Sequence, residues 1–175
     1  IKGPILCFVG PPGVGKTYLA ENVAEALGRP FKRFDMSEYS DKEAHLTFCG
    51  MNSAYKGSKV GTVTDFVDKN PKCVLLFDEI EKAHQNVIHI FLQMLDAGRV
   101  RDNFTEDEVS FVDTIIIFTT NAGKQLYENP AMGNLSLVSK KNVLNALETD
   151  INPVTNAPFF PRAICSRFAS GNIVM

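Results

Sequence analysis

The stretch Ile5-Leu-Cys-Phe-Val-Gly-Pro-Pro-Gly-Val-Gly-Lys-Thr17 decides the fold of this chain. Its start, Ile5–Val9, is entirely apolar, which predicts a strand that is buried on both faces. Residues 10–17 match the phosphate-binding pattern G-x-x-x-x-G-K-[ST] at every fixed position. The glycines allow a tight turn whose N–H groups, together with the N-terminus of the next helix, attract phosphate oxygens. The stretch therefore predicts a nucleotide site between a buried strand and a helix.

In this pattern Lys16 reaches the terminal phosphates, and the Thr17 hydroxyl binds Mg²⁺. We expect a nucleotide to contact the loop and the residues that open the helix, namely Gly10, Pro11, Pro12, Gly13, Val14, Gly15, Lys16, Thr17 and Tyr18. The alternative is a glycine-rich turn that binds nothing. It is disfavoured because a buried strand precedes the motif and a helical pattern over residues 15–27 follows it.

The overall composition limits the class of protein. The chain has 175 residues, enough for one sizeable core, and its net charge of −2 argues against a broad nucleic-acid-binding surface. Cys7 and Cys73 lie in apolar runs, and no C-x-x-C pair occurs, so we expect buried thiols rather than disulfides. No apolar run approaches the roughly 18 residues of a membrane span, and no signal sequence is evident. These features favour a cytoplasmic protein without a membrane partner.

Apolar strands and helices are expected to alternate along the chain. Strands are expected at 5–9, 31–35, 73–77, 114–120 and 172–175, helices at 15–27, 60–69, 86–95 and 139–150, a turn with a short helix at 37–45, a loop at 49–61 and a hairpin within 98–111. The strands with only apolar residues indicate a parallel sheet that is covered on both faces. The fold class is therefore α/β, with three layers and a central, mostly parallel sheet of five strands flanked by helices.

Polar residues follow the apolar strands at their carboxyl ends, where parallel sheets bind ligands. Asp78 and Glu79 follow the strand at 73–77. Asn121 follows the strand at 114–120, which we expect to lie between the strands at 5–9 and 73–77. The first carboxylate can hold Mg²⁺ with Thr17, and the second can polarise a water for attack on the γ-phosphate. The amide of Asn121 can hold that water or the phosphate without adding charge. The alternatives are surface acids and an asparagine that only form turns.

Three segments together resemble an AAA+ ATPase: residues 10–17, Val74-Leu-Leu-Phe-Asp-Glu-Ile-Glu-Lys-Ala-His84 and Thr119-Thr-Asn-Ala-Gly123. Two more, Phe34-Asp-Met-Ser-Glu-Tyr39 and Leu95-Asp-Ala-Gly-Arg99, are similar to the second ATPase module of the Clp unfoldases and disaggregases. The resemblance covers almost the whole chain. It implies that residues 1–175 form the large α/β subdomain of a P-loop NTPase, without the small helical domain.

This resemblance implies a role for each motif residue. Residues 10–17 correspond to Walker A, Asp78 and Glu79 to Walker B, and Asn121 to sensor 1. The catalytic set would be Lys16, Glu79, Asn121 and Arg167, with ATP and Mg²⁺ bound. Arg167 matches the arginine finger that reaches the γ-phosphate in a neighbouring subunit, the alternative being a surface arginine.

The resemblance also implies partners. Clp proteins form rings, usually of six subunits, that thread protein substrates through a central pore. Tyr55 and Lys56 lie where the family carries an aromatic loop that grips substrate, although Met-Asn-Ser-Ala-Tyr-Lys-Gly-Ser departs from the usual Pro-Pro-Gly-Tyr-Val-Gly. The alternative is a tyrosine that covers nearby apolar surface. The polar third residue of Met132-Gly133-Asn134 weighs against a peptidase partner. We expect a homo-oligomeric ring in the full-length protein and a mostly monomeric chain when these residues stand alone.

Three other functions compete with this interpretation. An AAA+ motor for nucleic acid, such as a helicase or clamp loader, is disfavoured by the acidic balance and the Tyr-Lys loop. A nucleotide-dependent scaffold is disfavoured by the intact Lys16, Glu79 and Asn121. A small-molecule kinase would need an acceptor pocket and a lid, and neither motif is found. His84 and His89 have no third metal ligand in view, so we expect surface or capping residues.

Overall fold

The computed structural model describes residues 5–11, 13, 15–122, 147, 151–152, 157–158, 160, 164 and 172–174. A parallel sheet of five strands forms its centre, in the order β2-β3-β6-β1-β9. These strands are β1 (Ile5–Val9), β2 (Phe31–Asp35), β3 (Val74–Asp78), β6 (Ile115–Thr120) and β9 (Asn172–Val174). The expected parallel sheet is confirmed, and β6 lies between β3 and β1 as predicted.

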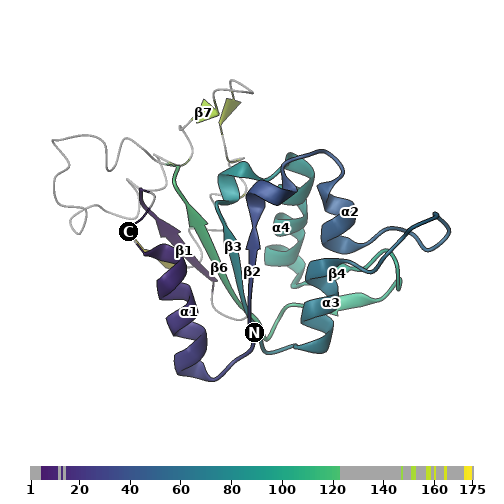
Figure 1. Cartoon of the computed structure of the whole chain (residues 1–175), viewed down its shortest axis with the longest axis horizontal. Coiled ribbons are helices and arrows are strands. Elements are labelled where there is room, and N and C mark those ends of the chain that lie inside the picture. The colour runs from purple at the N-terminus through teal and green to yellow at the C-terminus, as the bar shows by residue number, and fades with distance from the viewer. Residues whose placement is uncertain are drawn as a thin grey trace, which may run out of the picture.

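Helices pack on both faces of this sheet (Figure 1). They are α1 (Lys16–Leu27), α2 (Ala44–Cys49), α3 (Thr62–Lys69) and α4 (Gln85–Ala97), with the short 3₁₀ helices η1 (Met36–Tyr39) and η2 (Ile80–Lys82). Two antiparallel hairpins accompany them: β4 (Arg99–Arg101) with β5 (Glu108–Ser110), and β7 (Ile151–Asn152) with β8 (Ala157–Pro158). No helix in the described part of the chain is both long enough and apolar enough to cross a membrane.

Strand β3 shows how the sequence produces the three layers. All of its residues are buried, because neighbouring side chains point to opposite faces and both faces are covered. Val74 and Leu76 pack with Ala20 of α1, whereas Leu75 and Phe77 join the core beneath α2, α3 and α4. A strand that alternated apolar and polar residues could not occupy this central place.

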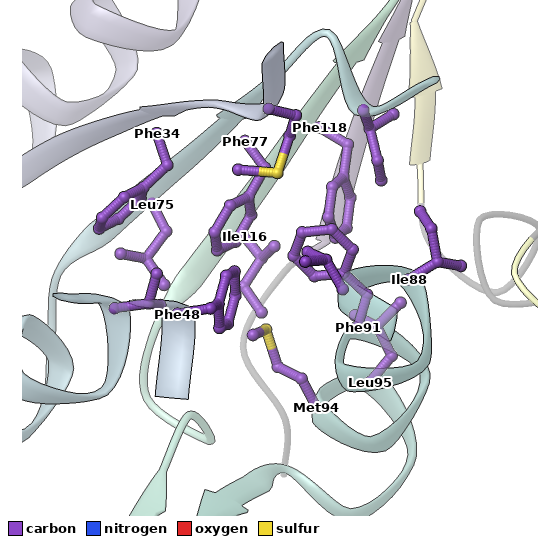
Figure 2. Close-up of a cluster of buried hydrophobic side chains, with 14 of the residues drawn as sticks. Phe34, Phe48, Leu75, Phe77, Ile88, Phe91, Met94, Leu95, Ile116 and Phe118 are labelled. Carbon is purple, nitrogen blue, oxygen red and sulfur yellow. The ribbon is translucent and has the colours of Figure 1, made fainter. Parts of the chain in front are cut away.

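Phenylalanines dominate the core on the α4 side (Figure 2). The ring of Phe77 lies 4.8 Å from that of Phe91 and 5.6 Å from those of Phe34 and Phe118, measured between centroids. Phe48 joins the group from α2, with its centroid 5.8 Å from that of Phe77. Offset-stacked and edge-to-face pairs of this kind each add about 0.5–1.5 kcal/mol beyond the burial of their area. This cluster fixes α2 and α4 against the strands that end in the polar residues.

The main departure from the sequence prediction concerns α2. Residues 37–45 were expected to hold a turn and a short helix, with a loop from 49. The structure instead places η1 first, capped by Asp35, whose side chain accepts a hydrogen bond from the Ser37 amide, and then starts α2 at Ala44. The helix continues to Cys49 because Phe48 and Cys49 are buried in the core. That prediction was therefore wrong about where the helix begins and ends.

The remaining expectations fall partly outside the described residues. The hairpin within 98–111 and the last strand are confirmed as β4–β5 and β9. Of the helix expected at 139–150, only the buried, helical Leu147 is described. Cys7 and Cys73 are buried, and burial raises the pKa of the Cys73 thiol to about 11 and that of Cys49 to about 12. The thiols of Cys49 and Cys73 are therefore protonated at neutral pH.

Candidate nucleotide-binding site

The phosphate loop leaves the end of β1 and enters α1. Its start is fixed to β6, because the Gly10 amide donates a hydrogen bond of 3.2 Å to the carbonyl of Thr120. Gly13 and Gly15 have φ angles of 81° and 90°, in the left-handed region that side chains with a Cβ rarely adopt. Gly15 is also the N-cap of α1, and no side chain in the described part of the chain caps that helix end. The loop and the helix end therefore suit an anion. Pro12 and Val14 lie outside the described residues.

A cavity of about 410 Å³ opens at the carboxyl edge of the sheet. Its walls come from the phosphate loop, from the end of β3 and from the residue after β6, and the lining residues are Gly13, Gly15, Lys16, Thr17, Tyr18, Asp78, Glu79 and Asn121. Residues that are far apart in the sequence thus meet at one place, as expected from the strand ends. Tyr18 lines the cavity with a side chain that is mostly exposed.

Lys16 is held inside this site by three acceptors. Its Nζ donates hydrogen bonds to the carbonyl oxygens of Gly10 at 2.9 Å and Pro11 at 2.8 Å, and to Oδ1 of Asn121 at 2.9 Å. Burial lowers the pKa of Lys16, and the nearby carboxylates of Glu81, Asp78 and Glu79 only partly oppose that effect. An incoming phosphate would therefore replace neutral oxygens as the partner of this ammonium.

Asp78 is buried and accepts hydrogen bonds from three side chains. Its Oδ2 lies 3.3 Å from Thr17 Oγ1 and accepts from Nε and Nη2 of Arg33 at 2.9 and 2.5 Å, while its Oδ1 accepts from Thr119. Burial alone would raise the pKa of Asp78, but the hydrogen bonds from Thr119 and Arg33 hold it below the usual value. The carboxylate is therefore ionised, and with the Thr17 hydroxyl it offers the oxygen ligands that Mg²⁺ prefers.

Glu79 follows with an unusual backbone. Its φ of 56° and ψ of 54° place a residue with a Cβ in the left-handed region, and its amide donates a 3.0 Å hydrogen bond to Thr119 Oγ1. The carboxylate forms an ion pair of 2.9 Å with Lys82 and accepts a 3.4 Å hydrogen bond from Nδ2 of Asn121. Asn121 thus bridges the lysine of the phosphate loop and the second carboxylate.

Three residues that support the site were not predicted from the sequence: Arg33, Thr119 and Glu81. Glu81 accepts hydrogen bonds from Thr120 Oγ1 at 2.9 Å and from the Asn121 amide at 3.1 Å, so it fixes the end of β6. Burial raises its pKa, although these hydrogen bonds lower it in part. Two threonines directly before Asn121 were a usable signal. Arg33 gave none, because its role depends on β2 lying beside β3.

The loop that carries Tyr55 and Lys56 projects from the α2 and α3 side of the molecule, away from α1 (Figure 1). Tyr55 is 65% exposed, so it does not cover apolar surface as the alternative supposed. Lys56 is exposed as well. Arg167 and the segment 132–134 lie outside the described residues.

The two histidines that were considered for a metal site lie at α4. His84 is the N-cap of that helix, and its Nδ1 accepts a 3.1 Å hydrogen bond from the Asn86 amide. His89 lies on the helix and is exposed. The expectation of a capping residue and a surface residue is therefore confirmed.

Comparisons with known proteins identify the family that the sequence motifs resemble. The family model of the AAA domain (Cdc48 subfamily) matches residues 4–162. Among curated relatives, the ClpA homolog protein of Fuscovulum blasticum is 45% identical over 127 residues, covering 72% of this chain and 16% of the relative. The chaperone protein ClpB of Clostridium perfringens is 42% identical over 151 residues, covering 83% and 17%. The chain thus spans less than a fifth of the length of these relatives.

A solved structure shares the fold over nearly the whole chain. It is a closed-state cryo-EM reconstruction of Hsp104 with ATPγS and FITC casein, which superimposes with a TM-score of 0.78 at 30% sequence identity. The match covers 99% of this chain and 28% of the Hsp104 chain. By its family match, its relatives and its fold, this chain belongs to the AAA family of ATPases, in the branch that contains the Clp chaperones.

Proposed function

We propose that this chain is the ATP-binding and ATP-hydrolysing motor domain of a Clp-type chaperone, formed by residues 1–175 as a large α/β subdomain, which remodels or threads protein substrates. The observation that carries the proposal is the meeting of Lys16, Thr17, Asp78, Glu79 and Asn121 around one cavity. Relatives named as ClpB chaperones, and an Hsp104 reconstruction that contains ATPγS and casein, support it.

The residues present fit a nucleotide with a divalent cation. Gly13 and Gly15 leave room for phosphate oxygens, since, apart from each glycine and its chain neighbours, no heavy atom of the described residues lies within 4 Å of where their Cβ atoms would be. Lys16 would exchange the carbonyls of Gly10 and Pro11 for the terminal phosphates. Thr17 and Asp78 would hold Mg²⁺, which when bound neutralises phosphate charge and orients the γ-phosphate.

Glu79 and Asn121 are proposed to handle the attacking water. Glu79 accepts a proton from this water as its oxygen attacks the γ-phosphorus, while the bond from that phosphorus to the bridging oxygen of ADP breaks. Asn121 already lies within hydrogen-bonding distance of both Lys16 and Glu79, so its amide is placed to orient the water between phosphate and base. Lys82 must release the Glu79 carboxylate at least in part, because an ion pair weakens a general base.

The proposal extends to assembly and substrate. In the full-length protein, a homo-oligomeric ring, usually of six subunits, would bring Arg167 of one subunit to the ATP of the next. Head-to-tail contacts of this kind are what closed rings with rotational symmetry use. The exposed Tyr55, with Lys56 beside it, would press on an extended protein chain in the pore. We place this motor in the cytoplasm and do not assign it a peptidase partner.

One experiment tests the proposal in the full-length protein. Its ATPase activity would be measured with casein and with DNA, and its ability to unfold a fluorescent tagged protein would be followed with ATP and without nucleotide. We expect stimulation by casein and ATP-dependent unfolding. Stimulation by DNA with no unfolding would favour the nucleic-acid motor, and no hydrolysis at all would favour a scaffold.

A mixing experiment tests the ring. Arg167→Ala subunits and Lys16→Ala subunits, each inactive alone, should regain part of the activity when mixed, because one subunit then supplies an intact loop and its neighbour an intact Arg167. Full activity of assembled Arg167→Ala protein would instead make Arg167 a surface arginine.

A further inference from the structure

Asp102 directly follows β4, between Glu79 and Asn121 in the sequence, and is 1% exposed. Both of its carboxylate oxygens accept hydrogen bonds. Oδ1 accepts from the amides of Phe104 and Thr105 at 2.9 and 3.0 Å, which closes the turn between β4 and β5. Oδ2 accepts from the Gly61 amide at 2.8 Å and from Thr64 Oγ1 at 2.5 Å, both at the start of α3. One buried carboxylate therefore joins the β4–β5 turn to the start of α3.

The start of α3 directly follows the base of the loop of residues 51–59, which we call the Tyr55 loop. Gly50 and Val60 form an antiparallel bridge at its base, and the Met51 amide donates to the Lys59 carbonyl at 3.2 Å. The β4–β5 turn contacts this base a second time, since the Asn103 amide donates a 2.9 Å hydrogen bond to the Cys49 carbonyl. A Cβ on Gly50 would lie 2.9 Å from the Gly61 nitrogen and 3.1 Å from Asp102 Oδ1, so the base of the Tyr55 loop fits tightly against the start of the turn.

These segments lie on opposite sides of β3 in the sequence. The Tyr55 loop leads through α3 into β3, and β3 leads through η2 and α4 into β4 and Asp102. Strand β3, which ends at Asp78, is therefore preceded by the Tyr55 loop and α3 and followed by η2, α4 and β4. Asp102 joins the start of α3 to the residue after β4. We propose that Asp102 is a positioning residue that makes the Tyr55 loop and the β4–β5 turn move as one unit with β3, so that events at the nucleotide reach Tyr55. This inference rests on the proposed motor function.

The substitution Asp102→Asn should break the link between the turn and α3 while leaving the turn itself intact. Asparagine forms the same local turn as aspartate, so its side-chain oxygen can still accept hydrogen bonds from the amides of Phe104 and Thr105. Its NH₂ group then faces the Gly61 amide, and two donors oppose each other where the link was. Thr64→Val removes only one of the two bonds to α3, and Asp107→Asn changes an exposed carboxylate in the same turn as a matched control.

Hydrogen exchange in the full-length protein gives the first readout. For Asp102→Asn we expect protection of amides 60–66 to fall about tenfold, which is the effect of losing a hydrogen bond to a charged group, with amides 102–107 still protected. Thr64→Val should give a smaller change in the same direction, and Asp107→Asn none. Wild-type protection of amides 60–66 in Asp102→Asn would overturn the proposal.

The second readout is the number of tagged protein molecules unfolded per ATP hydrolysed. We expect Asp102→Asn to lower this ratio, with basal hydrolysis near the wild-type rate, and Asp107→Asn to leave both unchanged. If hydrolysis and unfolding fall together with the melting temperature, or if the ratio is unchanged, Asp102 is only structural and the proposal is wrong. Absence of unfolding by the wild type would instead overturn the proposed function itself.

Discussion

Nζ of Lys16 and Oδ1 of Asn121 are 2.9 Å apart, so a direct hydrogen bond joins the phosphate loop after β1 to the end of β6. The two residues are separated by most of the described chain, and only the parallel sheet brings them together. Their contact means that the ammonium already points into the cavity before nucleotide arrives. The site is therefore largely preorganised, and its residues can be tested one at a time.

Removing the Lys16 ammonium should weaken nucleotide binding. Lys16→Ala deletes a charge-assisted partner of the phosphates, a contact worth about 1.5–3 kcal/mol, so affinity for ATP with Mg²⁺ should fall about 10- to 100-fold. Titration calorimetry of this chain measures the effect, and Lys72→Ala, at an exposed position, is the matched control. Unchanged affinity in Lys16→Ala would place the nucleotide elsewhere.

Changing Glu79 to glutamine should separate binding from hydrolysis. The amide keeps the size of the side chain but loses the basic oxygen, so full-length Glu79→Gln should bind ATP normally and turn it over about 10²- to 10⁴-fold more slowly. Steady-state hydrolysis and calorimetry would be compared with those of Glu25→Gln, an exposed change on α1. Near-normal turnover would mean that another group acts as the base.

Truncating Tyr55 should uncouple ATP hydrolysis from the unfolding of protein substrates. Because this side chain is 65% exposed, Tyr55→Ala should leave the melting temperature and basal hydrolysis of the full-length protein unchanged. Unfolding of a tagged protein should nevertheless fall, since an aromatic in the pore can grip an extended chain of any sequence. Equal loss of hydrolysis and unfolding, or loss of neither, would make Tyr55 a structural residue.

The aromatic core should respond in the opposite way. Phe77 is fully buried and contacts four other phenylalanine rings, so Phe77→Ala should destabilise the chain by about 3–5 kcal/mol. Chemical denaturation of the chain measures this, with Phe77→Leu as a milder variant that keeps most of the volume. A loss below about 1 kcal/mol would show that the core around β3 can repack.

Ionisation of Asp102 should make the free energy of unfolding depend on pH. Burial raises its pKa, but the hydrogen bonds from Thr64, Thr105, Gly61 and Phe104 outweigh burial and hold the pKa below its usual value of about 3.9. The folded state therefore binds this proton less readily than the unfolded state, and the carboxylate contributes stability that is present above about pH 4 and lost as the pH falls through the lowered pKa.

Melting temperatures across pH test this effect. The difference between wild type and Asp102→Asn should be greatest near neutral pH and should shrink as the pH falls below about 4. Asp107→Asn serves as the control for a carboxylate in the same turn. A difference that stays constant down to pH 2 would show that the charge of Asp102 does not stabilise the fold.

The sequence predicted the features that depend on local pattern. Short runs such as Val74-Leu-Leu-Phe77, bounded by Asn-Pro on one side and acidic residues on the other, favour buried strands, and the glycines of the phosphate loop allow special backbone angles. The start and end of α2 could not be predicted in this way, because Phe48 is buried by Phe77 and Phe91, which come from distant parts of the chain. Tertiary packing decided that element.

The same distinction applies to the candidate site. The motif residues at strand ends could be predicted to lie close together, because parallel sheets bind ligands at the carboxyl ends of their strands. Arg33 could not, because it reaches Asp78 only when β2 lies next to β3 in register, with Asp35 opposite Asp78. Asp102 was missed for a similar reason, since an aspartate in a polar hairpin gives no sign that it is buried against another segment.

The left-handed backbone at Glu79 has a consequence for evolution and engineering. A residue with a Cβ is disfavoured there by roughly 1 kcal/mol relative to glycine, so Glu79→Gly should fold more stably than the natural chain while lacking the carboxylate. A library of this domain sorted by heat resistance alone would therefore enrich glycine or asparagine at position 79 and discard the glutamate. Selection for survival at high temperature and selection for turnover would pull this one position in opposite directions.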